Sequence, residues 1–219
     1  MADALVLAMD GALGAFRCAL VRGDKTLSEG SAATNRALED GLGLIARTLA
    51  EASICAQDVD RIAAGTGPGS FTGLRIAVSY AKSLALGWKR PLVGVSCFDA
   101  LEFGIEAVPR LCVISARPGV ASVRLLDGDM RHRASGSAAA VADSVRSWLP
   151  GGRLACTGAA EDVLSALAER GFAVDILGSS FAPAQAIAML ASRRVPAANA
   201  HEVRADYGEL PPAKIPKRK

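Results

Sequence analysis

The densest chemical signal in the chain is the segment GTGPGSFTGLRIA, residues 65–77. A glycine-rich loop before a helix binds nucleotides when it carries further groups at set positions. A P-loop needs a lysine after its last glycine, and a dinucleotide loop needs the spacing GxGxxG. No lysine follows here, and the third glycine of GPGSFTG comes one position late. Neither type of nucleotide loop is therefore predicted.

Two interpretations of this segment remain open. The glycines can permit a sharp turn and close contact between a helix and a strand. Alternatively, the free N–H groups at the helix N-terminus can bind an anion. The candidate residues for such an anion loop are Gly67, Gly69, Ser70, Thr72 and Gly73.

Other catalytic groups are sparse. The two histidines, His132 and His201, do not form an HxxxH or HExxH pattern, so no metal site is predicted. Ser96 follows a predicted strand, but a nucleophile elbow requires glycine where Phe98 stands. The five cysteines include no CxxC pair, which predicts reduced and mostly buried thiols. We therefore predict no catalytic residue, no metal ligand and no cofactor of the chain's own.

Composition supports a compact cytoplasmic protein. The chain has 219 residues, 51% of them hydrophobic, and a net charge of +3 to which the terminal KIPKRK contributes. A nearly neutral body does not indicate a nucleic-acid surface. No apolar run approaches the ~20 residues of a membrane span, and the N-terminus lacks the basic start of a signal peptide. We expect no contact with a membrane.

The hydrophobic pattern predicts two α/β halves. The first half opens with a meander of three strands over 4–10 and 15–27, with its turn at Gly23–Asp24, and continues as helix, strand, helix, strand. Its second helix is expected from Thr72 to Leu86, closed by Gly87. The second half is predicted to contain strands at 110–116, 121–128, 153–158 and 172–177, with helices at 138–149, 160–171 and 182–194.

This order predicts an α/β protein with an actin-like (ASKHA, ribonuclease H-like) duplicated fold and two mixed-sheet subdomains. The expected N-terminal subdomain is 1–100 plus the final helix at about 182–195. The C-terminal subdomain is expected at 101–181, and an extended basic tail at 196–219. In actin-like phosphotransferases, an aspartate at the end of the first strand helps to hold a metal–nucleotide. Asp10 occupies that position, but GALGAF follows it without a hydroxyl or basic group, so a structural turn is favoured.

The segment GTGPGSFTGLRIAVSYAKSLALGWKRPLVGVSCFDAL closely resembles the signature of the TsaB (YeaZ) family. The start, LVLAMDGALGAFRCAL, resembles that family's first hairpin. The similarity is strong over about residues 60–101 and weaker elsewhere. Two elements depart from the family pattern: Ser115 and Ser122 replace an acid and a tyrosine in SARPGVAS, and Glu209 replaces an arginine in YGELPPAK.

The resemblance implies a non-catalytic subunit for TsaD, which transfers a threonylcarbamoyl group to an adenosine beside the anticodon of tRNA. It also implies the ATPase TsaE as a further partner, contact with tRNA only through the complex, and a homodimer when no partner is present. The alternatives are an actin-like nucleotide-binding phosphotransferase that uses Asp10 and the glycine loop, or a glycoprotease-like metallohydrolase.

The expected partner surface is formed by the two helices that flank the glycine loop, because apolar stripes and small residues permit close helix docking. The residues assigned to it are Leu38, Gly41, Leu42, Ile45, Leu74, Ala77, Val78 and Ala81.

Overall fold

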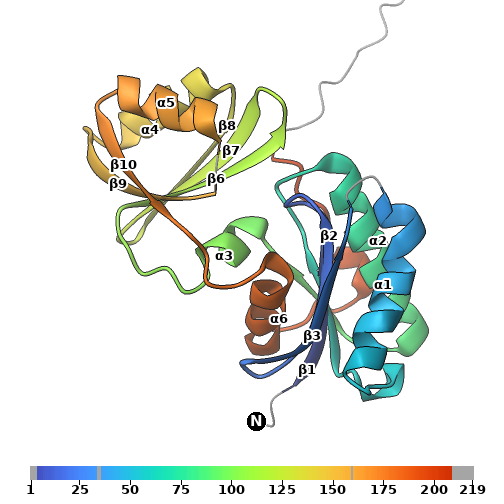
Figure 1. Ribbon diagram of the computed structural model, residues 1–219. Coiled ribbons are helices and arrows are strands. Elements are labelled where there is room, and N and C mark those ends of the chain that lie inside the picture. The colour runs from blue at the N-terminus through green and yellow to red at the C-terminus, as the bar shows by residue number, and fades with distance from the viewer. Residues whose placement is uncertain (1–3, 34–35, 159, 209–219) are drawn as a thin grey trace, which may run out of the picture.

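The protein, seen here as a computed structural model, has two subdomains, each built on a five-stranded mixed sheet (Figure 1). The described residues are 4–33, 36–158 and 160–208. In the first sheet the spatial order is β3-β2-β1-β4-β5, with β2 antiparallel and β4 parallel to the central strand β1. Its strands are β1 Leu5–Asp10, β2 Phe16–Arg22, β3 Lys25–Ala32, β4 Arg61–Gly65 and β5 Leu92–Val95.

The second sheet repeats this arrangement, in the order β10-β9-β6-β7-β8. Its strands are β6 Arg110–Arg117, β7 Val120–Asp127, β8 Met130–Gly136, β9 Gly152–Thr157 and β10 Phe172–Leu177. The sequence analysis missed β8, whose residues MRHRASG do not alternate between apolar and polar. As an edge strand in which every residue is exposed or only partly buried, β8 needs no such alternation. The short helix α3 Cys97–Glu102, which follows β5, was also not predicted. With β8 and α3 included, both halves follow the order β-β-β-α-β-α-β-α.

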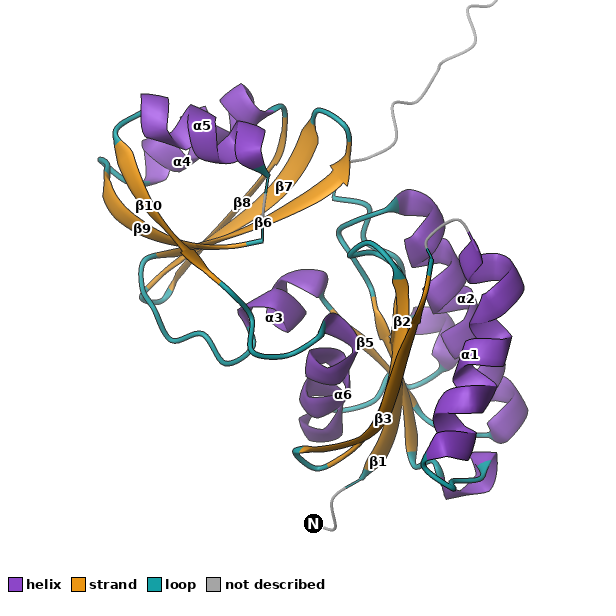
Figure 2. Cartoon of the chain, in the orientation of Figure 1, coloured by secondary structure: helices purple, strands orange, loops and turns teal. Residues whose placement is uncertain are grey.

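Helices cover both faces of the first sheet (Figure 2). Helices α1 and α2 pack on one face, and α3 and α6 lie on the other, where α6 contacts β1 and β2. In the second subdomain, α4 and α5 pack together on one face of the sheet. No helix among the described residues is long and apolar enough to cross a membrane. The helices are α1 Ala37–Glu51, α2 Phe71–Trp88, α3 Cys97–Glu102, α4 Ala138–Trp148, α5 Glu161–Glu169 and α6 Pro183–Arg193, with short 3-10 turns at Ala56–Asp58 and Ala200–Glu202.

Helix α2 ends later than its sequence predicts. Gly87 was expected to close it, but the helix continues to Trp88 and ends at Lys89, which adopts the left-handed conformation with φ 54°. The backbone N–H of Lys89 donates back to the carbonyls of Ala85 and Leu86. These hydrogen bonds satisfy carbonyls of the last turn. A residue other than glycine can therefore occupy the left-handed position that ends the helix.

Residues 196–208 belong to the first subdomain, which corrects the expectation of a tail that is extended from 196 onward. The backbone N–H of Ala197 donates to the carbonyl of Leu92 at 3.0 Å. Val203 is buried in the core that α1, α2 and β1 share. The remaining tail, including Glu209, lies outside the described residues.

The start of α2 lies directly against the turn that follows β1. A Cβ atom added at Gly73 would overlap the carbonyl of Gly11, and a Cβ atom added at Gly11 would overlap the carbonyl of Gly73. The two backbones are therefore in direct contact, and only glycine fits at either position. This contact fixes where α2 leaves the sheet.

We predict that Gly73→Ala destabilises the fold by about 1–3 kcal/mol, because the new methyl group must push two backbones apart. Thermal unfolding measured by circular dichroism should show this as a drop in Tm of about 2–4 °C per kcal/mol. The matched control is Gly43→Ala in α1, where an added Cβ meets nothing within 4 Å. That change should stabilise the protein by about 0.5–1 kcal/mol. Equal effects of both substitutions would contradict the packing argument.

Candidate functional site

The glycine loop between β4 and α2 is packed against two neighbouring segments. Gly67 and Gly69 have φ values of 96° and 153°, which favour glycine. An added Cβ would overlap the carbonyl of Asp206 at Gly67 and the carbonyl of Ala12 at Gly69. The loop is thus held between the turn after β1 and the segment that follows the last helix.

The chain's own atoms occupy two of the backbone N–H groups that an anion at the start of α2 could use. The N–H of Ser70 donates to the carbonyl of Ala12 at 2.8 Å, and the Ser70 hydroxyl caps α2 by accepting from the N–H of Gly73 at 3.4 Å. Thr72 is exposed at the surface, whereas Gly67 and Gly69 of the loop are buried. The geometry gives the glycines a packing role, and the anion loop remains a prediction that this arrangement does not support.

Asp10 faces inward and is fully buried. Its carboxylate accepts from the backbone N–H groups of Ala12 at 3.2 Å and Leu13 at 3.0 Å, so it closes its own turn. Burial raises the pKa of Asp10 above its usual value, and these backbone hydrogen bonds oppose that rise. The Cys97 thiol lies 3.6 Å from the carboxylate, and burial together with the charge of Asp10 raises the pKa of Cys97 well above its ordinary value.

Most residues predicted for the partner surface lie inside the molecule. Helix α2 uses its small and apolar face to cover the first sheet, because that face matches the strands' own apolar side chains. Leu74, Ala77 and Ala81 are completely buried, so they cannot contact a partner. The predicted surface is therefore corrected at Ile45, Leu74, Ala77, Val78 and Ala81, all of which are buried in the first core.

Gly41 packs against another helix of the same subdomain. A Cβ atom added there would come within 2.5 Å of the Tyr80 ring, so its missing side chain lets α1 and α2 approach each other. The hydroxyl of Tyr80 donates to the carbonyl of Leu38 at 2.8 Å. Of the eight predicted partner residues, Leu38 and Leu42 are exposed, by 67% and 54% of their surface.

An apolar groove on α2 lies against Leu38 of α1. It has a volume of about 290 Å³, and Leu38, Phe71, Ile76 and Tyr80 provide its apolar lining. Phe71 is 52% exposed, and the guanidinium of Arg75 lies 5.4 Å above its ring. Sequence reasoning missed Phe71 and Arg75, although their spacing of four residues places them on one side of a helix. Leu42 does not line the groove, but it is exposed and lies one helical turn from Leu38, on the same side of α1. We call the groove together with Leu42 the α1/α2 surface.

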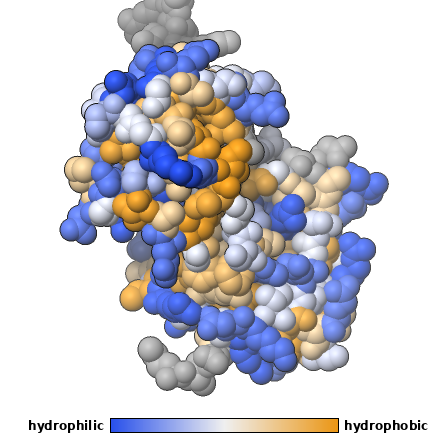
Figure 3. All heavy atoms as spheres, turned by 60° about the vertical axis from the view of Figure 1, so that its left-hand side comes forward, coloured by the Kyte–Doolittle hydropathy of each residue, from blue (hydrophilic) through white to orange (hydrophobic). Residues whose placement is uncertain are grey.

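Apolar side chains also gather on the second subdomain, among charged ones (Figure 3). The large exposed hydrophobic residues there include Ile176, on the edge strand β10, which is 64% exposed. Exposed hydrophobic residues are common on the surfaces of monomeric proteins. The α1/α2 surface differs because its exposed residues line a groove. Among the described residues, no three His, Cys, Asp or Glu side chains are placed to hold a metal ion.

Comparison with known proteins identifies similar sequences. The chain is 42% identical to the "tRNA threonylcarbamoyladenosine biosynthesis protein TsaB" of Escherichia coli over 66 residues, which cover 28% of this chain and 29% of that protein. It is 46% identical to the "tRNA N6-adenosine threonylcarbamoyltransferase" of Maricaulis maris over 54 residues, 25% of this chain and 14% of that protein. The matched segments thus span less than a third of either relative.

Comparison with solved structures confirms the predicted fold. YeaZ from Pseudomonas aeruginosa superposes with a TM-score of 0.69 and 24% identity, covering 93% of this chain and 99% of that one. The actin-like duplication predicted from the element order is therefore correct, and the resemblance to TsaB and YeaZ is confirmed. The family model described as "TsaD: tRNA N6-adenosine threonylcarbamoyltransferase" matches residues 32–189, more than half of the chain. The chain accordingly belongs to this family and, within it, is similar to TsaB and YeaZ.

Proposed function

We propose that the protein is a non-catalytic subunit that binds a TsaD-type threonylcarbamoyltransferase and supports the formation of threonylcarbamoyladenosine next to the anticodon of tRNA. The observation that carries the proposal is the exposed apolar groove on α1 and α2, in a chain similar to TsaB. Apolar and aromatic side chains in a groove are typical of the centre of a protein interface.

The burial of Asp10 supports a non-catalytic role. A phosphotransferase of this fold needs its first-strand aspartate and the following turn to face a metal–nucleotide. Here the Asp10 carboxylate bonds to its own turn, and the backbone of that turn contacts the start of α2. Opening this arrangement would leave a buried carboxylate and several backbone N–H groups without partners, which is costly. The groove outside this packed region then provides the functional surface.

The proposed assembly has one main partner. The TsaD-type subunit occupies the α1/α2 surface, a TsaE-type ATPase joins the pair, and tRNA is reached through the complex. In the absence of the partner, a second copy of the chain covers the same surface, because exposed apolar side chains are shielded when two copies pair. We propose that the protein acts in the cytoplasm, where tRNA is modified.

The first test is a charge placed in the α1/α2 surface. We predict that Leu42→Arg weakens binding of a co-expressed TsaD-type subunit by at least about thirtyfold, the usual cost of about 2 kcal/mol for a residue that anchors an interface. Because Leu42 is exposed, the variant should keep its Tm. Co-purification and titration calorimetry measure the effect.

The matched control is Ile176→Arg, which places the same charge at an exposed apolar residue of the second subdomain. It should bind the partner normally. If Leu42→Arg binds like the unchanged protein while Ile176→Arg does not, the proposed surface is wrong.

A second test measures the reaction. With a TsaD-type and a TsaE-type subunit present, tRNA modification should depend on this chain, and Leu42→Arg should lower it to the level seen without the chain. Mass spectrometry of nucleosides from digested tRNA gives the yield. Full modification in reactions that lack this chain would exclude a supporting role.

A third test addresses the nucleotide. Titration calorimetry of the isolated chain with Mg-ATP should show no binding, since the turn after β1 is filled by the chain's own groups. Binding that is tight and is lost in Asp10→Asn would instead favour a phosphotransferase.

A further inference from the structure

Two arginines of the second subdomain lie over one aromatic ring of the first. Arg124 on β7 and Arg133 on β8 are directly opposite each other in the sheet register. Their guanidinium carbons lie 5.1 Å and 5.0 Å from the ring centre of Phe98 in α3. Since like charges at opposed positions repel, each guanidinium needs a carboxylate nearby. The two arginines meet this need in different ways.

Arg124 is held by a buried ion network. Its guanidinium donates to Glu102 at 3.0 Å and 2.6 Å and to Asp99 at 2.6 Å. Asp99 also accepts from Arg194, just after α6, at 2.6 Å. Breaking one member of such a network leaves a buried charge unpaired, so this side of the subdomain junction is firmly fixed.

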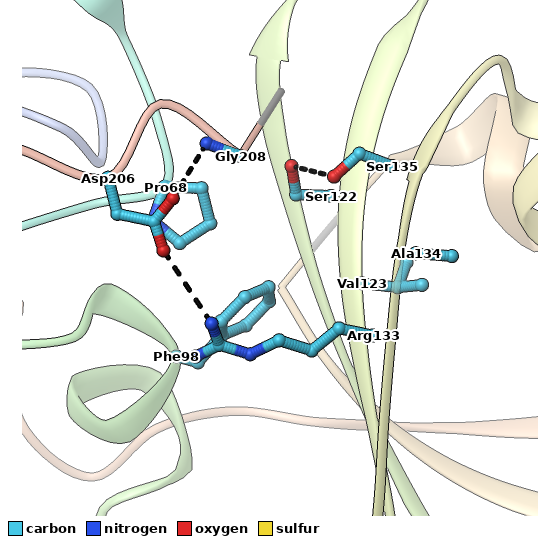
Figure 4. Close-up of a pocket in the computed structure, with 9 residues that line it drawn as sticks. All are labelled: Pro68, Phe98, Ser122, Val123, Arg133, Ala134, Ser135, Asp206 and Gly208. Atoms are coloured by element: carbon cyan, nitrogen blue, oxygen red, sulfur yellow. Dashed lines mark hydrogen bonds and ion pairs between the residues drawn. The ribbon is translucent and has the colours of Figure 1, made fainter. Parts of the chain in front are cut away.

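Arg133 is held by an exposed and looser pair. Its guanidinium lies 3.6 Å from the carboxylate of Asp206, and both side chains are about half exposed. Exposed pairs contribute little to stability and exchange readily with water. Figure 4 shows the Arg133 side chain extended beside Phe98 and directed toward Asp206, in a cavity of about 220 Å³.

Asp206 belongs to a short segment, residues 203–208, which we call the strap. The strap is anchored in the first core by Val203, and the N–H of Asp206 donates to the carbonyl of Thr66 at 2.6 Å. Its far end, Gly208, lies against Ser122 of the second subdomain. Between these contacts, the ring of Tyr207 lies 4.8 Å from that of Phe71. One segment of six residues therefore contacts the glycine loop, the second subdomain and the α1/α2 surface.

We propose that the strap is a releasable latch that couples the second subdomain to the α1/α2 surface. In the latched state, Asp206 pairs with Arg133 and Tyr207 covers part of Phe71. In the released state, both contacts are lost together, because adjacent residues of one short segment make them. Phe71 is then free for a partner, and the second subdomain keeps only its Arg124 contacts. The role of Phe71 in binding a partner rests on the proposed function, whereas the latch itself is a property of the isolated chain.

Partner binding and the Arg133 contact affect each other reciprocally. A partner that binds Phe71 and displaces Tyr207 weakens the Arg133 contact, and loss of the Arg133 contact must favour that partner by the same factor. The coupling is small, since an exposed ion pair and the contact of the exposed Gly208 with Ser122 hold the second subdomain's end of the latch.

Hydrogen–deuterium exchange of the isolated full-length chain tests the latch by charge reversal. Arg133→Glu and Asp206→Lys should each speed exchange of the strap amides by about two- to fivefold, the change expected for loss of an exposed pair, after correction for intrinsic rates. The double variant restores the pair with reversed charges and should return exchange to within about twofold of the unchanged protein. Equal exchange in all four proteins, or a double variant faster than both single variants, would overturn the proposal.

The control is a second exposed arginine–carboxylate pair of the same subdomain. Arg153 and Asp175 form two hydrogen bonds of 3.0 Å between β9 and β10. Arg153→Glu and Asp175→Lys should leave strap exchange unchanged. If they speed it as much as the Arg133 variant does, the effect comes from general loss of stability and the latch is refuted.

A test of the coupling between the two ends of the strap requires a substitution that changes only one of the two contacts, either Tyr207 with Phe71 or Asp206 with Arg133. Phe71→Ala removes the ring that Tyr207 contacts and should speed exchange of the Asp206 amide by about twofold or more. Leu86→Ala changes an exposed apolar residue of the same helix and should not. Unchanged strap exchange in Phe71→Ala would mean that the two ends are independent. Because no partner is present, these results stand whether or not the chain binds a TsaD-type subunit.

Discussion

The contact between the turn after β1 and the first turn of α2 determines much of the first subdomain. With glycine at both Gly11 and Gly73, the two backbones touch, and α2 leaves the sheet at a sharp angle. The polar groups of this crossing are satisfied internally, by Asp10 on one side and Ser70 on the other. Because α2 is fixed in this way, Gly41 can admit Tyr80, and the groove between α1 and α2 follows from the same geometry.

The connection between β9 and α5 in the second subdomain corresponds to the connection between β4 and α2 in the first. Gly158, where β9 ends, has a φ of 81°, and a Cβ atom there would overlap the carbonyl of Val113 in β6. In both halves, a glycine at the connection between a strand and the following helix packs closely against a neighbouring backbone. Gly73 does so at the start of α2, and Gly158 does so between β9 and α5. Helix α5 then starts at Glu161 after Ala160, which provides no side-chain cap, in contrast to Ser70 before α2. At this position, the second half keeps the close backbone packing of the first half but lacks the side-chain cap.

The sequence could predict most of the elements because periodicity reports which residues are buried. It could not predict β8, since an edge strand such as MRHRASG needs no alternation. The sequence also could not show which face of α2 is buried in the protein's own core. Small apolar residues permit close packing against any partner, so the pattern does not tell whether Ala81 faces the protein's own sheet or another protein. The strap depends on contacts between residues far apart in sequence, such as Asp206 with Thr66 and Arg133, which local patterns do not record.

Burial explains why the junction between the subdomains contains both firm and loose parts. Arg124 has lost most of its contact with water, so its position is secured only while Glu102 and Asp99 remain bound to it. Arg133 stays hydrated and can exchange its carboxylate for water at little cost. Both guanidinium groups lie over Phe98, so the ring keeps its buried contact with Arg124 when Arg133 moves. In the proposed latch, this asymmetry confines motion to the side where the strap passes, and Tyr207 of the strap contacts Phe71 of the groove.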